Sequence, residues 1–111
     1  PKARPVRIAV IIPALDEEAA IGLVVREVPT DLASEVLVVD NGSTDGTAEA
    51  ARAAGARVIH EPRRGYGTAC LAGVLAARDA DLLVFLDGDR SDDPSEMPRV
   101  LGRSWTAAPI W

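Results

Sequence analysis

Two acidic side chains follow an apolar run near the end of the sequence. Asp87 and Asp89 flank Gly88, and the preceding segment, Leu82 to Leu86, is entirely apolar. Because alternate residues of an extended chain point to the same side, both carboxylates are able to reach one hard cation and its waters. Mg²⁺ or Mn²⁺ held in this way would bridge the protein to a diphosphate. The alternative is a solvated acidic turn, since further acids and Pro94 come next.

A third acid, Asp40, ends another apolar run and precedes the turn sequence Asn41-Gly42. Asn-Gly supplies backbone conformations with positive φ, and Ser43 or Asp45 is suited to begin a helix. An ordinary strand-to-helix turn explains these later residues but does not require an acid at Asp40. We therefore expect Asp40 to accept hydrogen bonds from a base or a ribose.

The first apolar run leads into Asp16-Glu17-Glu18. A dinucleotide-binding domain would place a glycine-rich phosphate loop at this point. Acids at that position argue against NAD or FAD, although Glu17 and Glu18 alone would be ordinary residues for the start of a helix.

Two adjacent arginines, Arg63 and Arg64, precede a glycine-rich helix start. Guanidinium groups at a helix N-terminus are suited to contact a phosphate or an anionic acceptor. A solvent-facing loop explains either arginine equally well. We assign no role to His60 and expect Cys70 to serve packing.

Four apolar, β-branched runs predict the strands that position these residues: Arg7 to Ile12, Glu35 to Asp40, Arg57 to His60 and Asp81 to Asp87. The first, second and fourth are continuously apolar, which indicates strands covered on both faces. Right-handed crossovers between them predict a parallel, doubly wound α/β sheet. Ligands of such sheets bind at the carboxyl ends of the strands, where the acids are found.

Three helices are predicted between the strands. The first has an apolar stripe, and the second runs from Ala48 to Ala54 with Asp45 as cap and Gly55 as terminator. The third is capped by Thr68. The expected buried residues are Ile21, Val24, Val25 and Val28 in the first helix and Leu71, Val74 and Leu75 in the third.

The composition limits the classes of protein to consider. A chain of 111 residues that is 48% hydrophobic is sufficient for one core. Its apolar runs are far shorter than the roughly 20 residues that cross a bilayer, and no signal peptide is evident. A net charge of −5 argues against nucleic-acid binding. The single cysteine excludes a disulfide framework, and we expect a cytoplasmic protein.

Four segments in order carry a family resemblance: Ile-Ile-Pro-Ala-Leu-Asp-Glu-Glu, Val-Val-Asp-Asn-Gly-Ser-Thr-Asp-Gly-Thr, Arg-Gly-Tyr-Gly and Phe-Leu-Asp-Gly-Asp. Over residues 7 to about 101 the chain resembles family-two glycosyltransferases, especially relatives of dolichyl-phosphate mannose synthase and polyprenyl-phosphate glycosyltransferases. The resemblance implies a Rossmann-like GT-A parallel sheet with helices on both faces. The sequence ends soon after the Asp-x-Asp strand, so we expect a truncated GT-A domain.

The resemblance also implies roles for individual residues. Asp89 is the expected metal ligand, with Asp87 shared between metal and nucleotide, and Arg90 is a further candidate for phosphate contact. Asp16 stands where the family usually has asparagine. The expected nucleotide-binding residues are Pro13, Leu15, Glu17, Asp40, Asp87 and Gly88.

The implied activity is transfer of a hexose from a UDP- or GDP-sugar, with inversion, to an unidentified acceptor. A polyprenyl phosphate is one candidate acceptor, which would place the protein at the membrane surface. Family members are much longer, and no catalytic base is assigned in this chain. Two alternatives remain: a non-enzymatic nucleotide-binding fragment, and a haloacid-dehalogenase-type phosphohydrolase with Asp87 as nucleophile and Asp89 as acid.

The expected domain organisation is a nucleotide-sugar-binding part, residues 1–101, and a tail, residues 102–111. The tail carries both tryptophans of the chain and no usable periodicity. We hypothesise that residues from about Arg103 are a frame-shifted reading of a longer gene. An incompletely covered sheet would then favour self-association.

Overall fold

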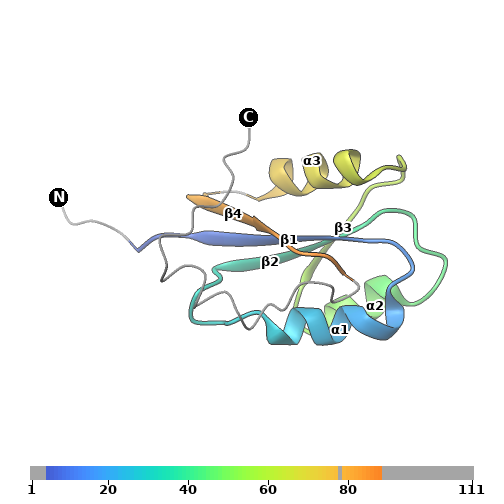
Figure 1. The fold of residues 1–111 in the computed structure, drawn as a ribbon, viewed down its shortest axis with the longest axis horizontal. Helices are drawn as coiled ribbons and strands as arrows, with labels where there is room; N and C mark the ends of the chain where they lie inside the picture. Colours follow the sequence, from blue (N-terminus) through green and yellow to red (C-terminus); the bar gives the residue numbers. More distant parts are fainter. Residues whose placement is uncertain (1–4, 78, 89–111) are drawn as a thin grey trace.

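The computed structural model describes residues 5–77 and 79–88, in which strands and helices alternate (Figure 1). All seven predicted elements are present. Their bounds are β1 Ile8–Ala14, α1 Glu18–Glu27, β2 Glu35–Asp40, α2 Thr47–Ala53, β3 Arg57–His60, α3 Tyr66–Ala76 and β4 Leu82–Phe85. The second and third strands match their predicted bounds, β1 continues two residues further, and β4 is shorter at both ends.

The four strands form one parallel sheet in the order β3-β2-β1-β4. The register pairs Ala14 of β1 with Asp40 of β2, and Asp40 with His60 of β3. The carboxyl ends of these strands therefore meet at one edge. The predicted parallel, doubly wound sheet is confirmed.

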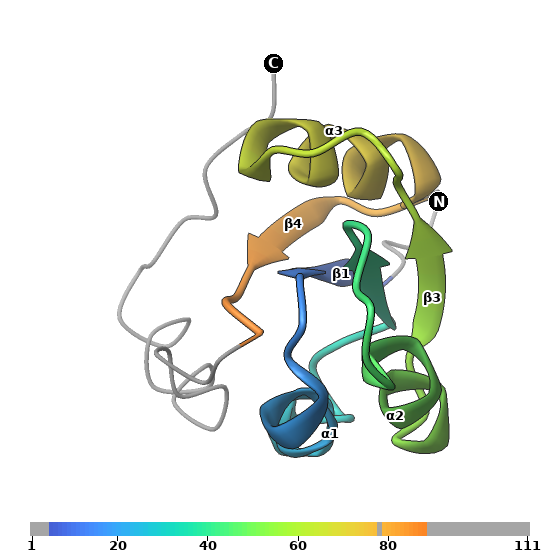
Figure 2. The same cartoon turned by 90° about the vertical axis from the view of Figure 1, so that its right-hand side faces the viewer.

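Helices cover both faces of the sheet, with α1 and α2 on one side and α3 on the other (Figure 2). Alternate residues of β1 divide between the two layers because successive side chains of a strand point to opposite faces. Val10 and Ile12 pack in the core shared with α1 and α2, whereas Ile11 packs in the core shared with α3. Burial on both faces explains why β1 is continuously apolar.

The predicted buried face of the third helix is wrong at two of its three residues, since Val74 does pack against the core on this side of the sheet. Ala69 and Gly73 face the sheet, while Leu71 is 53% exposed and Leu75 is 73% exposed. A Cβ added to Gly73 would lie 2.5 Å from Ile11 Cγ2, so the helix lies too close to the sheet for a larger residue. The predicted cap is wrong as well, because α3 begins at Tyr66 and Thr68 lies inside it.

Several predictions lie outside the described residues: the roles of Asp89 and Arg90, and the frame-shifted tail. Self-association likewise stays a prediction. Within the described part of the chain, no helix combines the length and the apolar character needed to cross a membrane.

Candidate functional site

A cavity of about 310 Å³ opens at the carboxyl edge of the sheet, between the ends of β1 and β2 and the start of α3. Two of the predicted nucleotide-binding residues, Pro13 and Leu15, and one of the three candidate arginines, Arg64, lie in its wall. The full lining is Pro13, Ala14, Leu15, Asn41, Arg64, Gly65, Tyr66 and Ala69.

The loop after β1 uses its acids for the fold rather than leaving them free around a ligand. Asp16 has a φ of +53°, a left-handed conformation that aspartate tolerates better than most residues. Its Oδ1 accepts a hydrogen bond from the Thr44 N–H at 2.8 Å, and its own N–H donates to Ser43 Oγ at 2.9 Å. The loops after β1 and β2 are thereby joined; both lie at the right-hand end of Figure 1.

Asn41 organises the loop that carries the arginines. Its buried side-chain amide donates to the carbonyl oxygens of Glu61 and Arg63, both at 2.8 Å. Its Oδ1 accepts from the Gly65 N–H at 3.0 Å. Both amide hydrogens are therefore used in holding the β3–α3 loop against the end of β2.

The two arginines differ in their partners. Arg63 forms a two-pronged ion pair with Glu61, with Nη2–Oε1 at 3.1 Å and Nε–Oε2 at 3.2 Å. The pKa of Glu61 is lowered because its carboxylate accepts hydrogen bonds from the side chain and the N–H of Arg63. Arg64 instead lies over Gly42, with its Nε 3.2 Å from the position that a Cβ would take, and lines the cavity.

Asp40 is buried beside a different cavity, of about 400 Å³, on the side of α2. Its Oδ1 accepts a hydrogen bond from the Ser43 N–H at 2.9 Å, and its Oδ2 lies 3.5 Å from His60 Nδ1. His60 also contacts Arg52, with 3.0 Å between Nε2 and Nη2. The proposed contact of Asp40 with a nucleoside stays a prediction, and so does that of Glu17, which is not among the residues lining the first cavity.

Asp87 is the second residue after the end of β4. Burial raises the pKa of the Cys70 thiol, a hydrogen bond with the Tyr66 side chain opposes this, and the negative charge of Asp87 raises the pKa further. The charge of Asp87 therefore acts on α3, although Asp87 is not among the residues that line the first cavity. Gly88 is packed against the end of β1, where an added Cβ would lie 3.3 Å from both Ala14 Cβ and the Pro13 carbonyl oxygen.

In residues 5–77 and 79–88, no group of three or more His, Cys, Asp or Glu side chains converges to hold a metal ion. Mg²⁺ bound to a nucleotide needs only one or two protein carboxylates, because phosphates and waters supply the other ligands. The carboxylate of Asp87 is suited to that incomplete ligand set. The second predicted ligand, Asp89, and the candidate phosphate contact, Arg90, lie outside the described residues.

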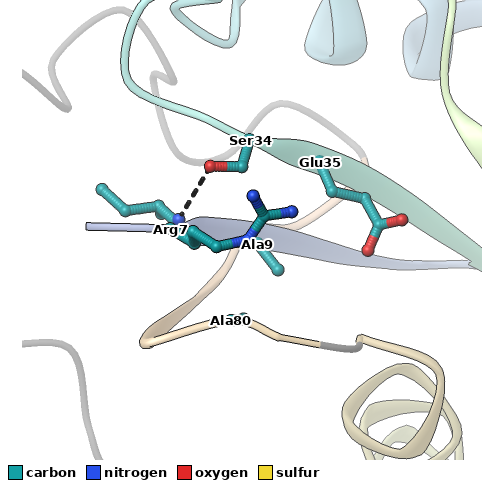
Figure 3. A pocket seen from close by; sticks show the side chains of 6 residues that line it. Arg7, Ala9, Ser34, Glu35 and Ala80 are labelled. Atoms are coloured by element: carbon teal, nitrogen blue, oxygen red, sulfur yellow. Dashed lines mark hydrogen bonds between the residues drawn. The ribbon is translucent and has the colours of Figure 1, made fainter. Parts of the chain in front are cut away.

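A much smaller cavity, of about 80 Å³, lies at the opposite edge of the sheet (Figure 3). Its wall includes Arg7, Glu35 and Ala80. Ser34 Oγ accepts a hydrogen bond from the Ile8 N–H at 3.2 Å and so anchors the start of β1 (Figure 3). Parallel α/β sheets bind ligands at the carboxyl ends of their strands, so we do not expect a ligand in this amino-end cavity.

Sequence reasoning missed Asn41 and Tyr66 as cavity residues. Asn41 could have been found from the sequence, because side chains two residues apart along β2 point to the same face of the sheet. Leu37 and Val39 pack toward α3, so Asn41 continues that face, whereas Asp40 continues the other.

Comparison with known proteins agrees with this geometry. Residues 9–104 match the family model described as glycosyl transferase family 2. An uncharacterized glycosyltransferase of Mycobacterium tuberculosis (strain ATCC 25618 / H37Rv) is 42% identical over 94 residues, covering 85% of this chain and 42% of the relative. A dolichyl-phosphate hexose transferase of Haloferax volcanii is 42% identical over 96 residues, covering 85% and 41%.

A solved structure also resembles this chain in sequence and fold. Glucosyl-3-phosphoglycerate synthase from Mycobacterium tuberculosis, in complex with Mn²⁺, UDP and glucosyl-3-phosphoglycerate, superposes with a TM-score of 0.77 at 35% identity. The match covers 90% of this chain and 40% of that protein. This chain thus spans less than half the length of these three relatives.

Proposed function

This chain belongs to glycosyl transferase family 2, and we propose that it forms the nucleotide-sugar-binding part of an inverting hexosyltransferase. The donor is a UDP- or GDP-sugar. The chain spans less than half of the relatives compared above, so the transfer activity of the whole protein is part of this proposal.

The observation that carries the proposal is the cavity at the carboxyl edge of the sheet. Its volume of about 310 Å³ lies at the lower end of the range for small-molecule sites. Pro13, Leu15 and Tyr66 give it an apolar wall suited to the flat face of a nucleoside, and Arg64 adds one positive charge. An apolar surface with a few polar groups is the usual lining of such sites.

We assign the basic residue to the diphosphate and the acidic residues to the nucleoside and the cation. Arg64 contacts the donor diphosphate, whereas Asp40 and Glu17, which lie outside the lining of this cavity, contact the nucleoside from beside it. Asp87, together with Asp89, holds the cation. A divalent cation in this place neutralises the diphosphate that departs from the sugar. The protein's own contribution is to position the donor in a fixed polar environment.

We further propose that the donor is a UDP-sugar, because UDP and Mn²⁺ occupy the similar structure from Mycobacterium tuberculosis. For the acceptor we propose a phosphate-bearing compound. This is supported by the names of two relatives, each of which includes a phosphate compound: dolichyl phosphate in one and 3-phosphoglycerate in the other. A lipid phosphate would bring the protein to the membrane surface; that location, like a cytoplasmic one, stays a prediction.

Calorimetric titration of the chain with UDP and GDP, with Mn²⁺ and then with EDTA, tests the nucleotide site. We expect UDP to bind in Mn²⁺ and to bind at least tenfold more weakly in EDTA, about 1.4 kcal/mol. Hydrolysis of UDP-glucose and of p-nitrophenyl phosphate, assayed side by side, separates glycosyl transfer from phosphohydrolase chemistry. Turnover of p-nitrophenyl phosphate without nucleotide binding would overturn the proposal.

A further inference from the structure

The loops after β1 and β2 exchange five backbone-to-side-chain hydrogen bonds, and we call residues 16–18 and 43–47 together the clasp. Three consecutive amides of the first loop donate to side chains of the second: Asp16 to Ser43 Oγ at 2.9 Å, Glu17 to Thr47 Oγ1 at 2.9 Å, and Glu18 to Asp45 Oδ2 at 3.3 Å. In return, the Thr44 N–H donates to Asp16 Oδ1 at 2.8 Å and the Gly46 N–H to Glu18 Oε1 at 3.1 Å.

Thr47 is at the centre of the clasp. Its side chain is fully buried, and its hydroxyl accepts from the Glu17 N–H while it donates to Asp45 Oδ1. The same Oδ1 accepts the Thr47 N–H at 3.0 Å. Removing this hydroxyl would take away a hydrogen-bond acceptor of the Glu17 N–H at a partly buried position, which is more costly than losing an exposed hydrogen bond.

The clasp begins one residue after the cavity wall. Leu15 is held on one side by Ala14, whose carbonyl accepts from the Asn41 N–H at 2.9 Å. On the other side it is held by Asp16, whose φ of +53° turns the chain into the clasp. Leu15 itself is 37% exposed, so packing alone leaves part of its side chain uncovered. Its place in the cavity wall therefore depends also on the segments before and after it.

We propose that Thr47 and Asp45 are positioning residues of the nucleotide site: through the clasp they hold Leu15 in the cavity wall before the nucleotide arrives. The inference rests on the proposed function. Neither residue touches the cavity that Leu15 lines. Their effect is preorganisation, because a wall that is already ordered costs less conformational entropy on binding.

Thr47→Val tests this by keeping the shape of the side chain and removing the hydroxyl, and Thr47→Ser is the rescue because serine keeps the hydroxyl. We expect UDP affinity in Mn²⁺ to fall about tenfold in Thr47→Val and to stay within about twofold of wild type in Thr47→Ser. Amide hydrogen exchange at Glu17 should accelerate in the valine variant only. Where Thr47→Val does not fold, Asp45→Asn replaces it, since it removes one acceptor at a less buried site.

Val58→Ala, at a partly buried position of β3 away from the clasp, controls for lost stability. A loss of UDP affinity in Val58→Ala equal to that in Thr47→Val would overturn the inference, because general destabilisation would then explain both. Unchanged UDP affinity in folded Thr47→Val would overturn it too while the proposed function stands. Wild type that binds neither UDP nor GDP would overturn the proposed function and this inference with it.

Discussion

Adjacent arginines with different partners allow a sharp test of the proposed diphosphate contact. We predict that Arg64→Gln weakens UDP binding and that Arg63→Gln does not. Arg63 is paired with Glu61 through two contacts of 3.1 and 3.2 Å, whereas Arg64 lines the cavity. Glutamine keeps part of the side-chain length and its hydrogen-bonding capacity while it removes the charge.

The expected size follows from the exposure of the site. A hydrogen bond to a charged group contributes about 1.5–3 kcal/mol, and solvent screening places an exposed arginine at or below the lower end. About 1.4 kcal/mol corresponds to a tenfold change, so we expect the Kd for UDP to rise about tenfold in Arg64→Gln. Arg63→Gln should stay within about twofold of wild type, but it should lower Tm because buried Glu61 loses its guanidinium partner and keeps only the N–H of residue 63.

Titrations with UDP and with uridine, at low and high salt, provide the measurement. Uridine lacks phosphate, so Arg64→Gln should leave its affinity unchanged and should flatten the salt dependence of UDP binding. Equal losses of UDP affinity in the two variants would refute the reasoning. A parallel loss of uridine affinity in Arg64→Gln would refute it as well, because the effect would then come from the cavity shape.

Three further predictions concern the metal, the packing of α3 and acid stability. Asp89→Asn should lower UDP affinity in Mn²⁺ at least tenfold and spare UMP, whereas Asp40→Ala should weaken both ligands alike; identical profiles in the titrations would contradict the division of roles. Gly73→Ala should destabilise the fold by about 1–3 kcal/mol in urea denaturation, because the added Cβ clashes with β1. Gly67→Ala is the control: its added Cβ has nothing within 4 Å, and it should stabilise the fold by about 0.5–1 kcal/mol. The pKa of Asp45 is lowered from its ordinary value of 3.8, chiefly by the hydrogen bond from the Thr47 hydroxyl. The Asp45 carboxylate therefore stabilises the folded state above that pH, and this contribution is lost as the pH falls below it. Tm measured from about pH 6 to about pH 3 should therefore fall less steeply in Asp45→Asn than in wild type, and parallel curves would rule this contribution out.

The sequence was sufficient for the order of the elements because each strand is apolar and each turn carries its own residues. Asn41-Gly42 after β2 and Gly55 after α2 adopt the turns that their residue types favour, with φ of +96° at Gly42 and +103° at Gly55. The acids at the ends of β2 and β4 also lie where the topology requires them. These features are local, or follow directly from parallel strands that share one edge.

The buried face of α3 could not be predicted from the sequence in the same way. Hydrophobicity favours Leu71 and Leu75 as the buried face, but the distance between helix and sheet decides which residues fit. Bulky side chains from the sheet, such as Ile11, fill the space, so only small residues such as Gly73 fit on the helix side. Complementarity of this kind depends on pairs of elements, and a single segment does not contain it.

Adjacent residues at the ends of the strands, such as Asp40 and Asn41, lie on different faces of the sheet for one physical reason. Successive residues of a strand point to opposite faces, and the cavity lies on the α3 face of the sheet. Counting outward from buried or partly buried residues of the core on the α3 side places Pro13 two residues after Ile11, Asn41 two after Val39, and Asp87 two after Phe85. Asp40 and Gly88 fall on the opposite face, and the structure has them beside the α2-side cavity and Ile21 respectively. Which polar residues line this cavity is therefore decided by their parity along the strand, and the proposed contact of Asp40 requires the nucleoside to reach past the sheet edge to the α2 side, which the Asp40→Ala titrations test.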